Sequence, residues 1–270
     1  MAEYFMQFNS IWVAVLAGIV VGLATGIGAL PIFFVRNIPK MVLDALLGAA
    51  AGIMLAVTAF NLIIPGIEKA GGGINGVSTV IIGMLSGGVF LDLVDKFFPN
   101  TNLLANSIPD TESIIDLTAT DIGLHKAWIF TIAISVHNIS EGLAVGVGFG
   151  DGDIYNGLSL AIGIGLQNIP EGLAVTLPLL RGGVAKWKVF LVALVTGLVE
   201  PLTSLIGIGI VSIFQSVLPF MLAFSAGAML FVIAHEIMPE SRKNSGHSKL
   251  AAYALIVGFV SMIFLGVLLG

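Results

Sequence analysis

Residues 127–149 read AWIFTIAISVHNISEGLAVGVGF, and residues 156–180 read NGLSLAIGIGLQNIPEGLAVTLPLL. Each stretch is a long apolar run that contains one short polar cluster. A helix needs about 20 apolar residues to cross a bilayer core, whereas the strands of a membrane barrel are much shorter and alternate in polarity. Both stretches are therefore predicted to be transmembrane helices.

The composition of the whole chain agrees with a membrane protein. Hydrophobic residues make up 57% of the sequence and charged residues 10%, against roughly 25% charged residues in a soluble globular protein. Such a chain cannot cover a water-facing surface, which excludes a soluble enzyme, a disordered protein and a nucleic-acid-binding protein. The chain has no cysteine, so a disulfide framework and a thiolate metal site are excluded as well.

Six further apolar runs have the length of a membrane span. The sequence therefore predicts an all-α integral membrane protein with eight transmembrane helices in a single domain, residues 1–270. One long connection, about 98–126, is predicted to be a flexible cytoplasmic loop, or alternatively a weakly acidic antechamber for a cation with His125 as an extra ligand. The eight predicted spans are 11–35, 41–64, 76–97, 127–149, 156–180, 188–213, 219–241 and 250–269.

The basic residues predict the orientation in the membrane. Ten of the 11 lysines and arginines flank the loops that follow spans one, three, five and seven, and Lys69 alone lies on the opposite side. Basic residues favour cytoplasmic loops, so both termini are predicted to lie outside a cell membrane (plasma or inner) that the chain crosses several times. The ten residues are Arg36, Lys40, Lys96, Lys126, Arg181, Lys186, Lys188, Arg242, Lys243 and Lys249.

The polar clusters of spans four and five form an internal repeat. Residues 137–145 read HNISEGLAV and residues 167–175 read QNIPEGLAV, with seven of nine positions identical. Side chains three and four residues apart share one face of a helix, so each glutamate can bridge two adjacent cation positions. One position would use His137, Glu141, Gln167 and Glu171, and the other would use Asn138, Glu141, Asn168 and Glu171. Span six adds Glu200 near its middle, next to Pro201.

These carboxylates have no predicted positive partner, because the interiors of the eight spans contain no lysine or arginine and only Lys96 and Lys188 lie at span ends. Placing an ionisable group inside a membrane costs free energy, so such groups usually have a functional role. Imidazole, carboxylate and amide oxygen are ligands for divalent cations such as Zn²⁺, Fe²⁺, Co²⁺, Mn²⁺ or Cd²⁺. The alternative is that these groups only hydrogen-bond one another and hold helices together, but the paired pattern favours a cation site.

Further polar residues extend the predicted transport path. His235 and Glu236 in span seven are predicted to form an exit or auxiliary metal site, with simple packing as the alternative, and Glu240 either joins this path or pairs with a nearby basic residue. Asp92 is expected to line the exit. On the outer side, Asn61 and Glu68 lie seven residues apart and could guide cations inward, although Glu68 and Lys69 could equally form an exposed pair.

The two motifs, the eight spans, the outside termini and the long third loop resemble the ZIP (Zrt/Irt-like protein) family of divalent-metal transporters, in its bacterial form. This resemblance implies a three-two-three arrangement of helices, metal import toward the cytosol, and a homodimer. It also implies a two-metal site between spans four, five and six, at His137, Asn138, Glu141, Gln167, Asn168, Glu171 and Glu200, and a span-seven pair at His235 and Glu236. Many family members have His at the position of Gln167 and Pro at the position of Ser140.

We therefore expect a transporter that carries a divalent metal, with zinc favoured, and not an enzyme. The metal is expected as cargo, with no catalytic cofactor, and no Walker-type loop for ATP is found. One rival is a membrane-embedded metallohydrolase, but the chain has no His-Glu-x-x-His sequence and only four histidines. A second rival is a proton- or sodium-coupled carrier of organic solutes, which would require an aromatic or cationic substrate pocket.

Overall fold

The computed structural model describes residues 10–35, 38–97, 119–150, 152–242 and 248–269, and every regular element in these ranges is a helix. Eight helical segments are long and apolar enough to span a membrane, which confirms the predicted class and number of spans. Of the predicted loop at 98–126, residues 98–118 lie outside the described residues, and residues 119–126 are helical rather than part of a loop. The eight segments are Ser10–Phe34, Lys40–Lys69, Gly73–Val94, Phe130–Gly148, Ile154–Arg181, Lys186–Ile213, Gln215–Ser241 and Ser248–Leu269.

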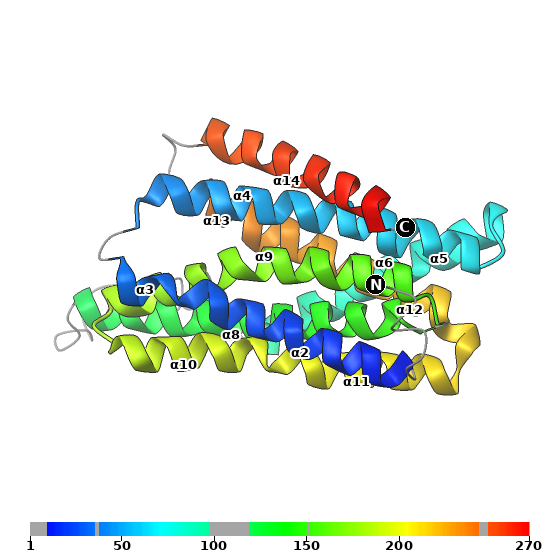
Figure 1. Ribbon diagram of the computed structural model, residues 1–270, viewed down its shortest axis with the longest axis horizontal. Helices are drawn as coiled ribbons and strands as arrows, with labels where there is room; N and C mark the ends of the chain where they lie inside the picture. Colours follow the sequence, from blue (N-terminus) through cyan, green and yellow to red (C-terminus); the bar gives the residue numbers. More distant parts are fainter. Residues whose placement is uncertain (1–9, 36–37, 98–118, 151, 243–247, 270) are drawn as a thin grey trace.

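Several spans consist of more than one helical element (Figure 1). The start of the first span and the end of the last lie at the same end of the molecule, as an even number of crossings requires. The elements are α2 (Ser10–Ala29), α3 (Pro31–Phe34), α4 (Lys40–Val57), η1 (Thr58–Ile63), α5 (Ile64–Lys69), α6 (Gly73–Phe97), α8 (Ala119–Gly148), α9 (Ile154–Arg181), α10 (Lys186–Gly197), α11 (Val199–Ile213), η2 (Gln215–Val217), α12 (Leu218–Val232), η3 (Ile233–Ile237), α13 (Met238–Ser241) and α14 (Ser248–Leu269).

Two of these elements are π turns, which the hydrophobic pattern did not predict. The turn η1 interrupts the second span and η3 interrupts the seventh, and a proline follows each turn, Pro65 and Pro239. The second span therefore continues to Lys69 rather than ending at residue 64 as predicted. Single π turns inside α-helices are often found at functional sites.

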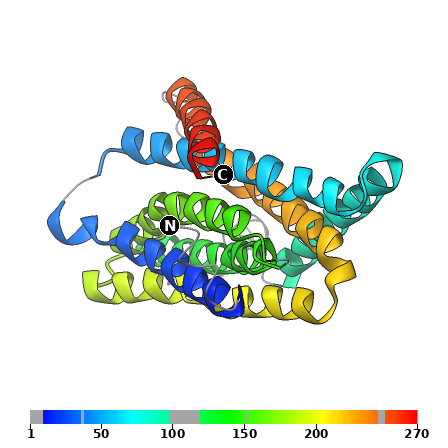
Figure 2. The same cartoon turned by 45° about the vertical axis from the view of Figure 1, so that its right-hand side comes forward.

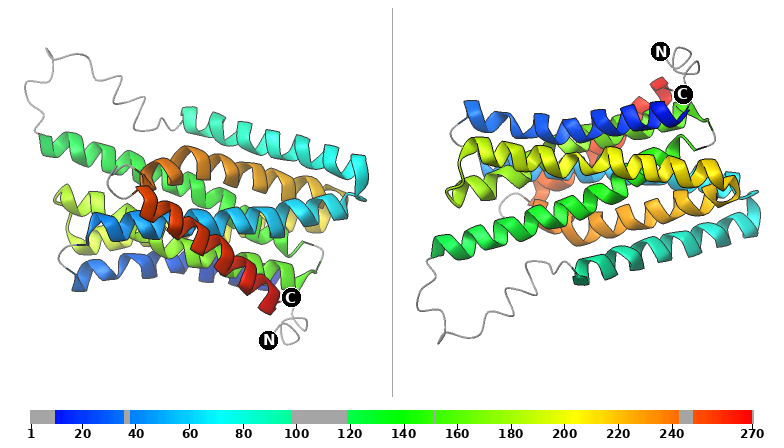
Figure 3. Two further views of the ribbon diagram at one scale, coloured as in Figure 1. Left: turned by 90° about the horizontal axis from the view of Figure 1, so that it is seen from above. Right: turned by 90° about the horizontal axis from the view of Figure 1, so that it is seen from below.

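The helices pack as two groups (Figure 2). The first bundle consists of α2, α8, α9, α10 and α11, and the second bundle consists of α4, η1, α5, α6, α12, η3, α13 and α14. Seen from below, α11 lies between α2 and α8, and α12 lies between α8 and α6 (Figure 3). The two bundles meet mainly where α4 packs on α9 and α12 packs on α8.

Glycines hold each bundle together internally. At Gly22, Gly146 and Gly172 an added Cβ would lie 1.9–2.3 Å from a backbone oxygen of another helix in the first bundle, and Gly52, Gly87 and Gly227 make equally close contacts in the second bundle. Such close backbone approach is typical of membrane helices, where small residues drive association. Between the bundles, Gly163 of α9 meets only the side chains of Val57 and Met262. Among the described glycines, the nearest backbone contacts with another helix thus lie within a bundle.

Candidate metal centre

The structure brings together one histidine and two glutamates from the repeated motifs. His137 and Glu141 lie four residues apart on α8, and Glu171 lies on α9. His137 Nε2 is 2.9 Å from Glu141 Oε1 and 3.7 Å from Glu171 Oε1, and the three side chains are fully buried. Ligand atoms from all three residues lie within 4.8 Å of one another, which is close enough for one metal ion to contact them together.

Gln167 lies next to this group of three residues. Its amide Nε2 donates a hydrogen bond to Glu141 Oε1, and its Oε1 has no hydrogen-bond partner. The helix α9 continues through Pro170, which cannot donate to the carbonyl of Leu166. Gln167 and Glu171 therefore stay on one face of the same helix, at the spacing that the sequence predicts.

The asparagines of the two motifs are oriented by backbone carbonyls of neighbouring helices. Asn138 Nδ2 donates to the carbonyl of Thr196 at 3.0 Å, and Asn168 Nδ2 donates to the carbonyl of Val21 at 3.2 Å. A carbonyl only accepts hydrogen bonds, so each amide nitrogen must face it and each Oδ1 must point elsewhere. Both Oδ1 atoms are buried and have no hydrogen-bond partner.

Glu200 joins the site through Asn168. Asn168 Nδ2 also donates to Glu200 Oε1 at 2.7 Å, while Glu200 Oε2 is buried without a hydrogen-bond partner. Gly142 explains why α11 comes so close, because an added Cβ there would lie 2.4 Å from the Glu200 carbonyl oxygen. Glu200 is not part of the group of three residues within 4.8 Å, so it lies to one side of that group.

The site has an excess of buried acceptors. Eight buried atoms have no hydrogen-bond partner, seven oxygens and one nitrogen, and an unsatisfied buried polar atom costs about 1–3 kcal/mol. Within 4 Å of these carboxylates the described residues offer no lysine or arginine, and His137 alone can supply a positive charge. The eight atoms are His137 Nδ1, Asn138 Oδ1, Glu141 Oε2, Gln167 Oε1, Asn168 Oδ1, both Glu171 oxygens and Glu200 Oε2.

The structure separates the two predicted residues of span seven. Glu236 Oε2 lies 3.9 Å from His137 Nδ1 at the edge of the site, and both residues line one small pocket. The ring of His235 is exposed and stacks on Phe231 with 5.1 Å between ring centroids. In this structure Glu236 therefore faces the site, whereas His235 faces Phe231.

The four predicted path residues differ in exposure, and among them Glu68, Asp92 and Glu240 are not part of the group of three ligands within 4.8 Å. Glu68 is exposed, Glu240 is half-buried, and Asp92 is exposed with its carboxylate 3.6 Å from Lys96 Nζ. Asn61 is buried in η1. Asp44, to which the sequence assigned no role, is buried on α4.

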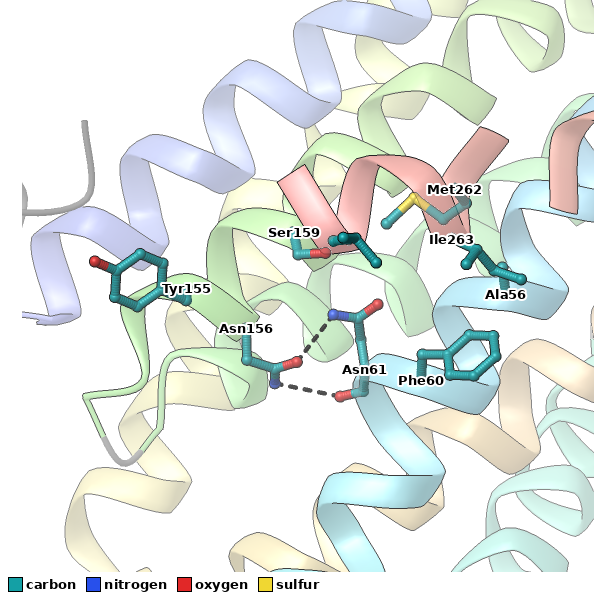
Figure 4. Close-up of a pocket in the computed structure, with 10 residues that line it drawn as sticks. Ala56, Phe60, Asn61, Tyr155, Asn156, Ser159, Met262 and Ile263 are labelled. Carbon is teal, nitrogen blue, oxygen red and sulfur yellow. Dashed lines mark hydrogen bonds between the residues drawn. The ribbon is translucent and has the colours of Figure 1, made fainter. Parts of the chain in front are cut away.

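Asn61 contacts Asn156, a residue that the sequence did not single out. Asn61 Nδ2 donates to Asn156 Oδ1 at 2.9 Å, and Asn156 Nδ2 donates to the Asn61 carbonyl at 3.2 Å (Figure 4). Pro65, four residues after Asn61, has no N–H to donate to that carbonyl. The pair links the two bundles and lines a cavity of about 370 Å³, together with Ser159 and Met262.

Comparison with known proteins finds one family. A family model described as "ZIP Zinc transporter" matches residues 109–266. The chain is 38% identical to zinc transporter ZIPB of Bordetella bronchiseptica, over 95% of this chain and 81% of the relative. It is 36% identical to zinc transporter GufA of Myxococcus xanthus, over 94% and 98% of the two chains. Zinc transporter ZupT of Clostridium perfringens is 34% identical, over 95% of each chain.

Proposed function

Since the chain belongs to the ZIP family of zinc transporters, we propose that it moves zinc and related divalent cations into the cytoplasm through a two-metal site between α8, α9 and α11. As a member of this family the chain is a transporter of divalent metal in the cell membrane and not an enzyme. The membrane-embedded metallohydrolase is therefore not favoured.

One observation carries the proposal: eight buried oxygen and nitrogen atoms of the two motifs and Glu200, all able to bind a metal ion, lack hydrogen-bond partners. A carboxylate in a low-dielectric interior needs a compensating charge, and among the described residues His137 is the only basic group within 4 Å of these carboxylates. Imidazole nitrogen, carboxylate oxygen and amide oxygen together are a typical ligand set for borderline and hard divalent ions. A divalent cation would satisfy these atoms and balance their charge at once.

The atoms without hydrogen-bond partners are enough for two cation positions. The first position would use His137, Gln167 and the two bridging glutamates, Glu141 and Glu171. The second would use the Oδ1 atoms of Asn138 and Asn168, the same two glutamates, and Glu200. His137 Nε2 lies near both bridging glutamates, while the hydrogen bond from Asn168 holds Glu200 on the other side.

The site is closed at the end near the start of α9, and this supports import toward the cytoplasm. Toward the start of α9, the side chains of Met54, Val57, Leu160 and Ile164 are completely buried and belong to one apolar core. Toward the other end, His137 and the partly exposed Glu236 line a small pocket. The predicted cytoplasmic loops lie at this second end, so the conformation fits a site that releases metal inward.

The packing supports alternating access by movement of one bundle against the other. Glycine-mediated backbone contacts join helices within each bundle, whereas side chains meet at the boundary. Side-chain contacts can be exchanged more easily than interlocked backbones, so each bundle can move as a rigid body. Since α8 and α9 belong to the first bundle and Glu236 to the second, this movement would also carry the metal site past Glu236.

Uptake by proteoliposomes tests the proposal. Glu171→Gln removes one charge at nearly constant volume and leaves the cation position short of a bridging ligand, so we expect zinc uptake to fall at least 100-fold. Gln215→Ala changes an exposed residue in η2 and serves as the control with parental uptake. Parental uptake by both variants would contradict the assigned site, and a competition series with Fe²⁺, Mn²⁺, Co²⁺ and Cd²⁺ would rank the cargo.

A further inference from the structure

The first bundle contains a repeated docking geometry. Asn138 donates to the carbonyl of Thr196, and Gly142, four residues later, lies against the carbonyl of Glu200, four residues after Thr196. Likewise Asn168 donates to the carbonyl of Val21, and Gly172 lies against the carbonyl of Thr25. Each motif thus holds a neighbouring helix at two points one turn apart. The span from Lys186 to Ile213 occupies for α8 the place that α2 occupies for α9.

The two docked helices also contact each other at equivalent residues. Gly22 follows Val21, and Gly197 follows Thr196. An added Cβ on Gly22 would lie 2.3 Å from the Gly197 carbonyl oxygen, and one on Gly197 would lie 2.2 Å from the Gly22 carbonyl oxygen. The contact is therefore reciprocal, as a pseudo-two-fold relation between the two helix pairs requires. In this relation the counterpart of Glu200 is Thr25.

The hydroxyl of Thr25 differs from those of four other buried threonines and shares its lack of a hydrogen-bond partner with Thr58, which lies in the π turn η1 of the second bundle. Thr131, Thr176, Thr196 and Thr203 each donate a hydrogen bond to a carbonyl of their own helix. Thr25 is completely buried, and its Oγ1 has no hydrogen-bond partner.

The surroundings of Thr25 explain why it forms no bond to its own helix. The carbonyl of Val21, four residues earlier, already accepts a hydrogen bond from Asn168 Nδ2. The carbonyl of Gly22, three residues earlier, is covered by Gly197. A carbonyl oxygen has two acceptor positions, and the helix uses one of them. The metal motif itself thus occupies an acceptor that Thr25 would otherwise use.

We propose that the Thr25 hydroxyl is an uncharged oxygen ligand of the second cation position, on the side opposite Glu200. The inference rests on the proposed function and adds a residue from α2 to the site. Thr25 lies where α2 meets both α9 and α10, because its carbonyl faces Gly172 of α9 and its Cβ would lie 3.0 Å from an added Cβ on Gly197 of α10. A neutral oxygen here leaves the site with three carboxylates instead of four. The cation is then bound less tightly than by four carboxylates and can be released.

Paired valine substitutions test the assignment. Thr25→Val and Thr176→Val both replace a completely buried threonine with a residue of the same shape, but only Thr176 loses a hydrogen bond, to the Leu173 carbonyl at 2.9 Å. We expect Thr25→Val to raise the half-saturating zinc concentration about fivefold, the effect of one net polar contact. Thr176→Val should leave this concentration unchanged.

Thermal unfolding of the metal-free protein provides the second measurement. Thr25→Val removes an unsatisfied polar atom, so it should melt at or above the parental temperature, while Thr176→Val should melt below it. Parental zinc affinity in Thr25→Val would overturn the inference, as would an affinity loss in Thr25→Val that is accompanied by a lower melting temperature. Failure of the parental protein to take up zinc would instead contradict the proposed function, so the two failures are distinguishable.

Discussion

Replacing Gly142 with alanine should displace Glu200 from the metal site. The new Cβ would lie 2.4 Å from the Glu200 carbonyl oxygen and 2.1 Å from Thr203 Oγ1, whereas real Cβ contacts are essentially never below 3.0 Å. The Thr203 side chain can rotate away, but the backbone of α11 can only retreat, by at least about 0.6 Å. Metal sites require their ligand distances within about 0.2 Å, so this shift is large enough to weaken ligation by Glu200.

Gly209 of α11 offers a matched control, because an added Cβ there meets no atom within 4 Å. Both alanine variants gain helix propensity of up to about 1 kcal/mol, and only Gly142→Ala adds an overpacking cost of about 1–3 kcal/mol. The differences in stability and zinc affinity between the two variants therefore report the effect of the contact between Gly142 and α11. Groups that orient metal ligands typically contribute 10–100-fold to affinity, and we expect a loss of that size in Gly142→Ala.

Zinc uptake in proteoliposomes and thermal unfolding in detergent measure the two effects. Gly142→Ala should melt several degrees below Gly209→Ala and should require at least tenfold more zinc for half-maximal uptake. Gly209→Ala should match the parental protein in uptake and equal or exceed it in stability. If the two variants took up zinc with the same half-saturating concentration, the close approach of α11 at Gly142 would not be what holds Glu200 at the site.

Three further predictions follow from the contacts of the site and the bundle boundary. Gln167→His exchanges an amide for a stronger zinc ligand, so half-maximal uptake should need less zinc while the maximal rate falls because release slows. Zinc at 100 times its dissociation constant should stabilise the parental protein by about 2.7 kcal/mol against thermal unfolding, and Glu171→Gln should lose most of this shift. The chain has no cysteine, so a single cysteine introduced by Val57→Cys can be labelled with an impermeant thiol reagent, and its labelling rate reports opening between α4 and α9. Asn156→Ala loses two hydrogen bonds and Asn61→Ala loses one. The labelling rate should therefore rise more in Asn156→Ala than in Asn61→Ala.

The grouping of three candidate ligands could be predicted because their spacing is local. His137 and Glu141 share a helix face through simple periodicity, and the repeat places Glu171 at an equivalent position on the next helix. The structure brings these three residues within 4.8 Å of one another. No distant contact needs to be known for such a prediction, since α8 and α9 are joined by a short connection and must pack side by side.

Other features depend on contacts that sequence spacing does not reveal. Asn156 lies in the first turn of α9, and its partner Asn61 is 95 residues away in a π turn. His235 and Glu236 are adjacent in sequence, yet they point in different directions, toward Phe231 and His137. Thr25 is one small residue in an apolar helix, and its unsatisfied hydroxyl becomes apparent only when the partners of the Val21 and Gly22 carbonyls are known.

The shared residues of the two motifs have a double role that explains why asparagine, glutamate and glycine occur together. The asparagine and the glycine lie four residues apart and grip the backbone of one neighbouring helix, at Thr196 and Glu200 in one case and at Val21 and Thr25 in the other. The glutamate lies directly before the glycine, so the same turn that docks the helix also positions the carboxylate. A change that loosens the docking must therefore move a ligand, which ties the rigidity of the first bundle to the geometry of its cation site. In the described residues the second bundle makes no such backbone contact with these motifs, which supports the proposed movement along the boundary between the bundles.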